Sequence, residues 1–247
     1  TIVTTATSSY SLYNGITVSD VSVTNADNDL AGVTVSPTTL STIEGGSGTF
    51  TIALNTQPSS DVTISLSSLD ISEGTVNPTS VTFTNTNWAA KTITVAGVND
   101  NIDDGDITYT IQIASAVSAD VAYSGIDPAD VTVTNLDDDA ADISVTPTSG
   151  LTTTEVGGSA TFSIVLTSEP TAIVTIGISS SDITEGTVSA STLVFNSTDW
   201  NTPKTITVYG VNDNIDDDNV EYTILIAQAS SSDGKYRPLI LEQPNLF

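Results

Sequence analysis

The sequence predicts an all-β protein built from consecutive antiparallel β-sandwiches in an elongated array. Thr, Ser, Val and Ile dominate its 247 residues and only 6% are aromatic, a composition that suits half-buried pleated strands. Short runs of alternating polar and apolar residues are divided by turns rich in Gly, Pro, Asn and Asp. A unit of roughly 110 residues occurs twice, which is typical of modular arrays.

The repeat extends over almost the whole chain. KTITVAGVNDNIDDGDITYTI, from Lys91, returns as KTITVYGVNDNIDDDNVEYTI, from Lys204. YNGITVSDVSVTNADND, from Tyr13, aligns with YSGIDPADVTVTNLDDD, from Tyr123. The sequence therefore predicts three parts: the C-terminal strands of a preceding partial repeat (1–29), a complete repeat (30–139), and a second repeat with an atypical or missing last strand (140–247).

Seven alternating runs in the complete repeat predict its strands. They cover residues 32–36, 48–55, 61–67, 80–85, 91–97, 107–114 and 129–135. Seven strands in a repeat of this length are typical of an immunoglobulin-like sandwich. We therefore expect tandem immunoglobulin-like sandwiches.

The charge balance excludes several classes of partner. Four basic residues stand against thirty acidic ones, for a formal charge of −26. Such a surface repels nucleic acid and anionic membranes. No apolar run approaches the roughly 20 residues of a transmembrane helix, so we expect no membrane insertion.

The absence of cysteine and histidine restricts the chemistry further. It excludes disulfides, thiolate or imidazole metal sites, and catalysis by Cys or His. Paired carboxylates, as in glycoside hydrolysis, are the remaining catalytic option. These acids lie in repeated loops that imply no substrate cleft, so we expect the protein not to be an enzyme.

The acidic residues gather at one end of the complete repeat. If seven strands alternate in direction, the first, third and fifth loops share an end with the exit of the last strand. Ten carboxylates meet there: Glu44, Asp70, Glu73, Asp100, Asp103, Asp104, Asp106, Asp137, Asp138 and Asp139.

So many adjacent carboxylates either take up protons or bind hard cations. Calcium is the first expectation because it accepts six to eight oxygens in irregular geometry; magnesium, which demands stricter geometry, is the second. Two other interpretations stay open. The acidity could simply keep an extracellular protein soluble, and single acids such as Asp70 or Asp182 could close turns.

Three motifs resemble the Calx-β domain, a calcium-binding immunoglobulin-like sandwich: DNDLAG from Asp27, the turn Glu44-Gly-Gly, and GVNDNIDD…YTIQI from Gly97. The resemblance implies calcium between the first-loop Glu, the third- and fifth-loop acids, and the acidic linker after the last strand. In the first copy it implies the ligands Glu44, Asp70, Asp100, Asp103, Asp104, Asp137, Asp138 and Asp139, with the backbone carbonyl of Ile102.

The second copy departs from this pattern because no acidic linker follows Tyr236. We expect its site to be weaker unless a neighbour supplies oxygens. The corresponding residues are Glu155, Asp182, Asp213, Asp216, Asp217 and Asp218; Asp27 and Asp29 are the exit acids of the partial repeat.

These features predict a calcium-binding structural protein of the cell surface or extracellular space, such as an adhesin stalk, surface layer or filament. Calcium would stiffen the junctions between repeats. The alternative is a calcium-dependent sensor or glycan-binding module.

We expect the partners of the chain, besides calcium, to be neighbouring repeats or like subunits. The ends of the sequence suggest how like subunits could join. Residues 20–25 match the strand that the second copy lacks, so one subunit could lend it to the next. An arbitrary fragment, or a final strand over residues 239–242, is the alternative explanation of the ends.

Overall fold

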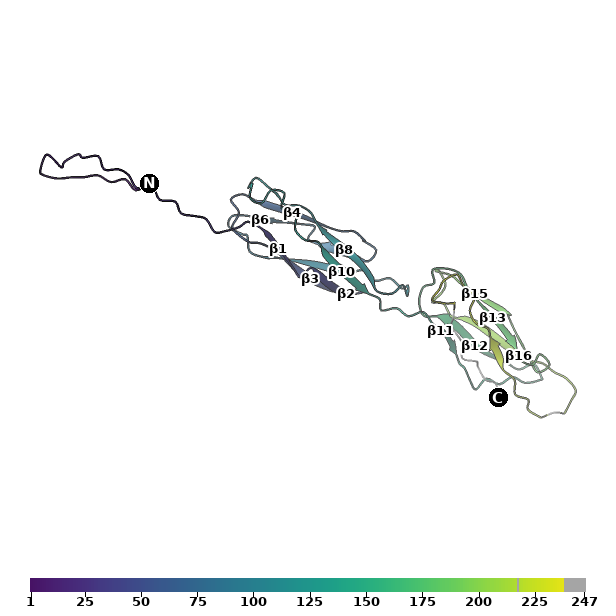
Figure 1. The fold of residues 1–247 in the computed structure, drawn as a ribbon. Coiled ribbons are helices and arrows are strands. Elements are labelled where there is room, and N and C mark those ends of the chain that lie inside the picture. Colours follow the sequence, from purple (N-terminus) through teal and green to yellow (C-terminus); the bar gives the residue numbers. More distant parts are fainter. Residues whose placement is uncertain (217, 238–247) are drawn as a thin grey trace.

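The computed structural model describes residues 1–216 and 218–237, and these residues form strands, turns and bends without a helix. The prediction of an all-β protein is confirmed. Two strand-rich units follow one another along the chain (Figure 1), unit 1 over residues 33–136 and unit 2 over residues 143–237. Each has a separate buried core. The described part of the chain holds no helix that could span a membrane.

Unit 1 consists of two sheets. The first has, in spatial order, β1 (Val33–Ser36), β3 (Ser47–Leu54), β7 (Lys91–Gly97) and β5 (Gly74–Asn77). The second has β2 (Thr39–Ile43), β10 (Val131–Leu136), β8 (Ile107–Ile113), β4 (Val62–Ser68) and β6 (Ser80–Phe83), with β9 (Val117–Ser118) beside β4. Neighbouring strands pair antiparallel, except that β10 and β2 are parallel.

Each of the seven predicted runs overlaps a strand, but the structure adds β2, β5 and β9. β2 follows β1 across Pro37, and β5 precedes β6 across Pro78, with each pair divided between the two sheets. β2 and β5 therefore each divide one passage of the chain between the two sheets without reversing its direction. The loops predicted to share an end still do so.

Strict alternation along the strands builds the core. On β3, Phe50, Ile52 and Leu54 are buried while the residues between them are partly exposed. Their counterparts on β12, beginning with Phe162, follow the same pattern. Because successive side chains of a strand point to opposite faces, every second residue enters the space between the sheets.

Unit 2 repeats most of this arrangement. Its first sheet has β11 (Ile143–Thr146), β12 (Ser159–Leu166), β16 (Lys204–Gly210) and β14 (Gly186–Val188). Its second sheet has β15 (Thr192–Phe195), β13 (Val174–Ser180) and β17 (Ile224–Ile226). Within residues 143–216 and 218–237 no strand corresponds to β10. The possible final strand at 239–242 lies outside the described residues.

A buried tyrosine marks the same position in both units. Tyr123 is 1% exposed, and its hydroxyl bonds to the backbone and side chain of Thr56. Tyr236 is 0% exposed and makes the equivalent bonds to Ser168. The structural repeat therefore continues as far as Tyr236.

The N-terminal segment, residues 1–30, lies apart from both units (Figure 1). Isolated bridges join Ile2 to Val21 and Thr5 to Thr17. Nearly all of its side chains are exposed, including 53% of Val21 and 65% of Val23. In this structure, residues 20–25 add to neither sandwich.

Candidate metal centre at the end of unit 1

The register of three strands explains why acids from distant parts of the sequence meet. β2 and β10 lie side by side and parallel, with Ile43 opposite Leu136, so the residues that follow both strands leave at one end. β8 is antiparallel to β10, with Ile107 opposite Asn135. The loop that precedes β8, residues 98–106, therefore lies at this end too.

Two groups of carboxylates at this end have oxygens within 4.8 Å of one another, a spacing that a metal ion could bridge. Glu44 belongs to both groups: one adds Asp100 and Asp139, the other Asp104 and Asp137. Glu44 is only 7% exposed, and its Oε2 accepts a hydrogen bond from the Asp100 backbone N–H at 3.2 Å. Neither of the two ion pairs among the described residues involves these five acids.

Backbone hydrogen bonds fix the orientation of these carboxylates. Asp137 accepts the Gly105 N–H at 2.7 Å and the Asp139 N–H at 2.9 Å. Asp100 accepts the Ile102 N–H at 2.7 Å. Each of these carboxylates keeps further lone pairs that could bind a cation.

The electrostatics of the cluster oppose full ionisation. Burial raises the pKa of Glu44, and the neighbouring Asp100, Asp137 and Asp138 raise it further. The pKa values of Asp104 and Asp139 are raised for the same two reasons, burial first and nearby carboxylates second. A cation bound among these carboxylates would therefore stabilise their ionised form.

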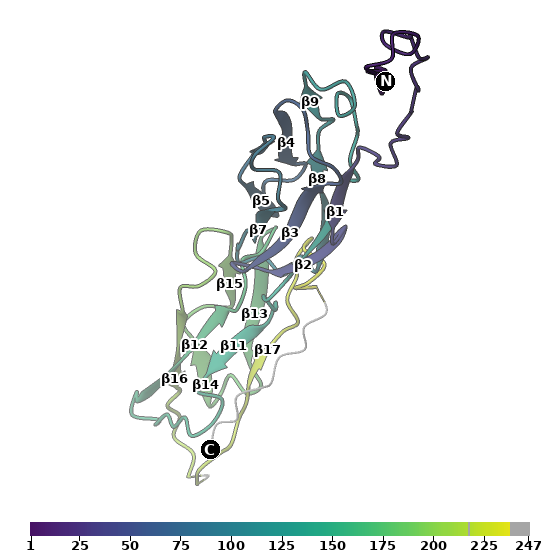
Figure 2. The same ribbon diagram turned by 90° about the vertical axis from the view of Figure 1, so that its left-hand side faces the viewer.

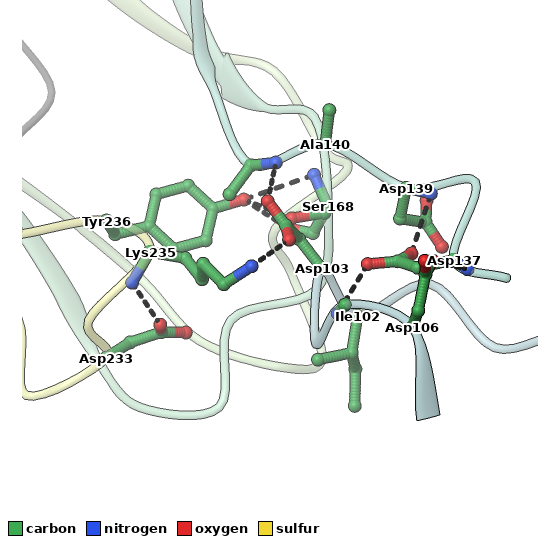
Figure 3. Close-up of polar contacts among 12 residues, drawn as sticks. Ile102, Asp103, Asp106, Asp137, Asp139, Ala140, Ser168, Asp233, Lys235 and Tyr236 are labelled. Atoms are coloured by element: carbon green, nitrogen blue, oxygen red, sulfur yellow. Dashed lines mark hydrogen bonds and ion pairs between the residues drawn. The ribbon is translucent and has the colours of Figure 1, made fainter. Parts of the chain in front are cut away.

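Asp103, from the same loop, faces unit 2. One of its oxygens accepts the Ala141 N–H at 2.9 Å, and the other is paired with the Lys235 ammonium (Figure 3). The Lys235 hydrogen bond lowers the pKa of Asp103. A backbone bond from the Glu169 N–H to the Asn101 carbonyl, 2.6 Å long, also joins this loop to unit 2.

The remaining predicted ligands of unit 1 lie outside the two groups. Asp70 closes a turn by accepting the Ser72 N–H at 3.1 Å and the Ser72 hydroxyl at 2.5 Å. Asp138 is exposed. The Ile102 carbonyl accepts the Asp104 N–H at 2.9 Å and retains one lone pair.

Two residues near the site were not among its predicted ligands. Burial raises the pKa of Glu73 most, and the charges of Asp104, Asp70 and Asp100 raise it further against a hydrogen bond with Asn135 that lowers it, so this carboxyl lies near the cluster. The sequence had already placed it among the ten carboxylates at this end, in the repeated motif EGTV. Lys235 has no counterpart in the first copy, where Ala122 precedes the tyrosine, so the repeat pattern gave no signal for it.

The predicted ligands of unit 2 do not form such a group among the described residues. Glu155, Asp216 and Asp218 are exposed, and Asp213 accepts the Ile215 N–H at 2.8 Å. Asp182 closes a turn with Thr184 as Asp70 does with Ser72. Asp217 lies outside the described residues.

In the N-terminal segment, Asp27 and Asp29 are exposed, and Asp27 accepts the Asp29 N–H at 3.0 Å. Asp137 and Asp139, which follow unit 1, make the same local bond. The two exit motifs therefore share a local conformation, although only the second lies beside other acids.

No protein-family model matches the sequence, and no curated protein matches it. Among solved structures, domains 5–6 of the S-layer protein SbsC are 16% identical, with 89% of this chain and 98% of that chain covered and a TM-score of 0.27. A chaperone–tip adhesin complex of CFA/I fimbriae is 12% identical, with coverages of 80% and 98% and a TM-score of 0.34. A C. elegans MSP family member is 16% identical, with coverages of 42% and 95% and a TM-score of 0.29. Likenesses at these scores assign the chain to no family and no function.

Proposed function

We propose that this chain is a calcium-binding structural protein of the cell surface, whose consecutive sandwiches form an extended array stiffened by calcium at their junctions. The single observation that carries the proposal is Glu44, a buried carboxylate shared by both groups of acids. Two like charges about 5 Å apart repel by about 3 kcal/mol at an effective dielectric constant of about 20. Of the nearby side chains, Lys235 acts on Asp104 and Asp137 but is paired with Asp103, so five such groups favour a further counter-charge.

Calcium fits the donor set best. All the candidate ligands are oxygens, which favours Ca²⁺ or Mg²⁺ over softer metals. The carboxylates come from separate loops in irregular array, which calcium tolerates better than magnesium. Glu44 would bridge two ions, one beside Asp100 and Asp139 and the other beside Asp104 and Asp137. The Calx-β resemblance favours the same metal.

The loop over residues 98–106 supports a mechanical role for the metal. Asp100 and Asp104 belong to the carboxylate groups, whereas Asn101 and Asp103 contact Glu169 and Lys235 of unit 2. Because the four residues share one short loop, an ion that held Asp100 and Asp104 would also hold Asn101 and Asp103 in place. Binding would order the linker, residues 137–142, and hold unit 2 in one orientation.

A calcium titration by calorimetry of the wild-type chain and a Glu44→Gln variant tests this function. We expect the wild type to bind calcium and the variant to bind at least tenfold more weakly, because it loses a charge and a shared ligand. Glu155→Gln, the counterpart in unit 2, is the matched control and should leave the tightest binding unchanged. Absence of binding to the wild type at millimolar calcium, or equal affinity in Glu44→Gln, would contradict the proposal.

A further inference from the structure

Unit 2 contains a groove of about 330 Å³ at the end that carries its acidic loop. Residues 151–156 line it together with Glu185, Asp218, Asn219, Val220 and Tyr222. Leu151, Val220 and Tyr222 make part of the lining apolar, while Glu155, Glu185 and Asp218 add carboxylates. The lining of the groove therefore offers both apolar and acidic groups.

In unit 1 the equivalent space is filled by the last strand. β10 lies between β2 and β8, with Val133 opposite both Leu40 and Tyr109 and Asn135 opposite both Thr42 and Ile107. The counterparts of these flanking residues in unit 2 are Leu151, Tyr222, Thr153 and Val220, all of which line the groove. The groove thus occupies the place of a strand that the described residues of unit 2 do not contain.

Residues 20–25 have the sequence that fits this place. They read DVSVTN, against DVTVTN for residues 130–135, so Ser22 for Thr132 is the single difference. In unit 1, Val131, Val133 and Asn135 are at most 1% exposed. Val21 and Val23, by contrast, remain more than half exposed in the N-terminal segment.

We propose that residues 20–25 of a second copy of this chain enter the groove of unit 2 as its last strand. Figures 1 and 2 show the N-terminal segment at the opposite end of the molecule from β16, so the donor must be another copy. The register of β10 places Val23 between Leu151 and Tyr222, and Asn25 between Thr153 and Val220. Each added copy presents a new groove, so the contact propagates head to tail.

The polar chemistry of the groove matches the incoming Asn25. In unit 1, Asn135 accepts from the Thr42 hydroxyl at 3.0 Å and donates to the Val98 carbonyl at 2.9 Å. Asn25 would make the same bonds to Thr153 and to the carbonyl of Val211. Thr153 now bonds to the Tyr222 hydroxyl at 2.7 Å, and it would exchange this partner for the asparagine.

One consequence rests on the proposed function. Asp27 and Asp29 would follow the donated strand and lie beside Glu155, as Asp137 and Asp139 lie beside Glu44. The second calcium site would then be completed by a neighbouring molecule. Strand exchange itself requires no metal.

Disulfide cross-linking tests the register directly, because the chain contains no cysteine. An Asn25→Cys, Thr153→Cys double variant should form a ladder of covalent oligomers under mild oxidation. Each single variant should give at most dimers, and a mixture of the two should give a covalent heterodimer. Circular dichroism checks that all variants are folded.

A folded double variant that stays monomeric would overturn the proposal, including the case in which residues 238–247 of the same chain fill the groove. A second test uses Val23→Asp in the full chain, with Val3→Asp as the control in the same exposed segment. Light scattering at rising concentration should show oligomers for wild type and Val3→Asp, and monomers for Val23→Asp. Equal masses for all three would also contradict strand exchange.

The cross-linking is run in chelator and in calcium, which separates the two proposals. A ladder in chelator supports strand exchange whatever the metal does. No ladder in either condition overturns strand exchange, even where calorimetry finds calcium bound at Glu44.

Discussion

At the scale of single residues, Glu44 shows how the fold keeps a charge at a cost in stability. Its burial raises the pKa of the carboxyl above the ordinary value of 4.5. A raised pKa means that the folded state holds the proton more tightly than the unfolded state. The stabilising contribution is therefore complete below the ordinary value and is lost as pH rises through the folded value.

This sign predicts the effect of Glu44→Gln on the calcium-free protein. At pH 7 the variant should be more stable than wild type by roughly 1 to 2 kcal/mol, because it removes a buried charge among like charges. The difference in stability should shrink as pH falls toward about 4, because wild-type Glu44 is then protonated and, like the Gln side chain, uncharged. Urea unfolding in chelator at several pH values measures this difference. A difference that stays constant with pH would contradict the assignment of Glu44.

Asp103 has the opposite dependence, because hydrogen bonds from Lys235 and Ala141 lower its pKa. Its contribution is present above the ordinary value and is lost as pH falls through the folded value. Asp103 is present in both wild type and Glu44→Gln, so its contribution cancels in the difference between their free energies of unfolding.

At the scale of secondary structure, Asn135 joins the elements that make the site. It is 1% exposed and bonds to Thr42 on β2 and to the carbonyl of Val98 at the start of the loop 98–106. A buried carbonyl or hydroxyl that loses its partner costs about 1–3 kcal/mol. The side chain therefore positions both Glu44 and the fifth-loop acids.

We expect Asn135→Ala to lower the stability of unit 1 by about 2–3 kcal/mol and to weaken calcium binding. Thr134→Ala is the matched control, since Thr134 is the next residue on β10 and bonds to Thr108 on the exposed face. That change should alter stability by less than about 0.5 kcal/mol. Denaturant titration of both variants checks the result, and equal stabilities would show that Asn135 has no such role.

The elements were predictable where side chains repeat with a period of two and turns carry Gly, Pro or Asp. The seven runs of unit 1 met both conditions. β2 and β5 did not, because Pro37 and Pro78 transfer one passage of chain between the sheets within two residues. The convergence of Glu44, Asp100, Asp104, Asp137 and Asp139 followed from strand direction alone, so it survived these omissions.

Other parts of the site depend on side-chain placement that strand order does not specify. Asp70 was an expected ligand, yet the hydroxyl of Ser72 two residues later holds it in a turn. Lys235 reaches Asp103 because Asp233 binds the N–H groups of Thr171 and Lys235 and fixes the connecting turn (Figure 3). No repeat or spacing in the sequence predicts this contact between the two copies.

At the scale of the whole molecule, the junction between the units consists of few direct contacts. Those described are the ion pair of Lys235 with Asp103 and the backbone bonds to Ala141 and Glu169. Exposed ion pairs stabilise weakly and are screened by salt. Repulsion within the carboxylate groups acts in the calcium-free state, so we infer that the metal decides whether the junction is rigid.

Small-angle scattering with calcium and with chelator tests this claim most directly, using Val23→Asp so that strand exchange does not alter the mass. With calcium, a single relative orientation of the two units should fit the profile. With chelator, we expect a broad range of orientations to be required, and the same broad range for Glu44→Gln in either condition. Superimposable profiles with calcium and with chelator would contradict the account.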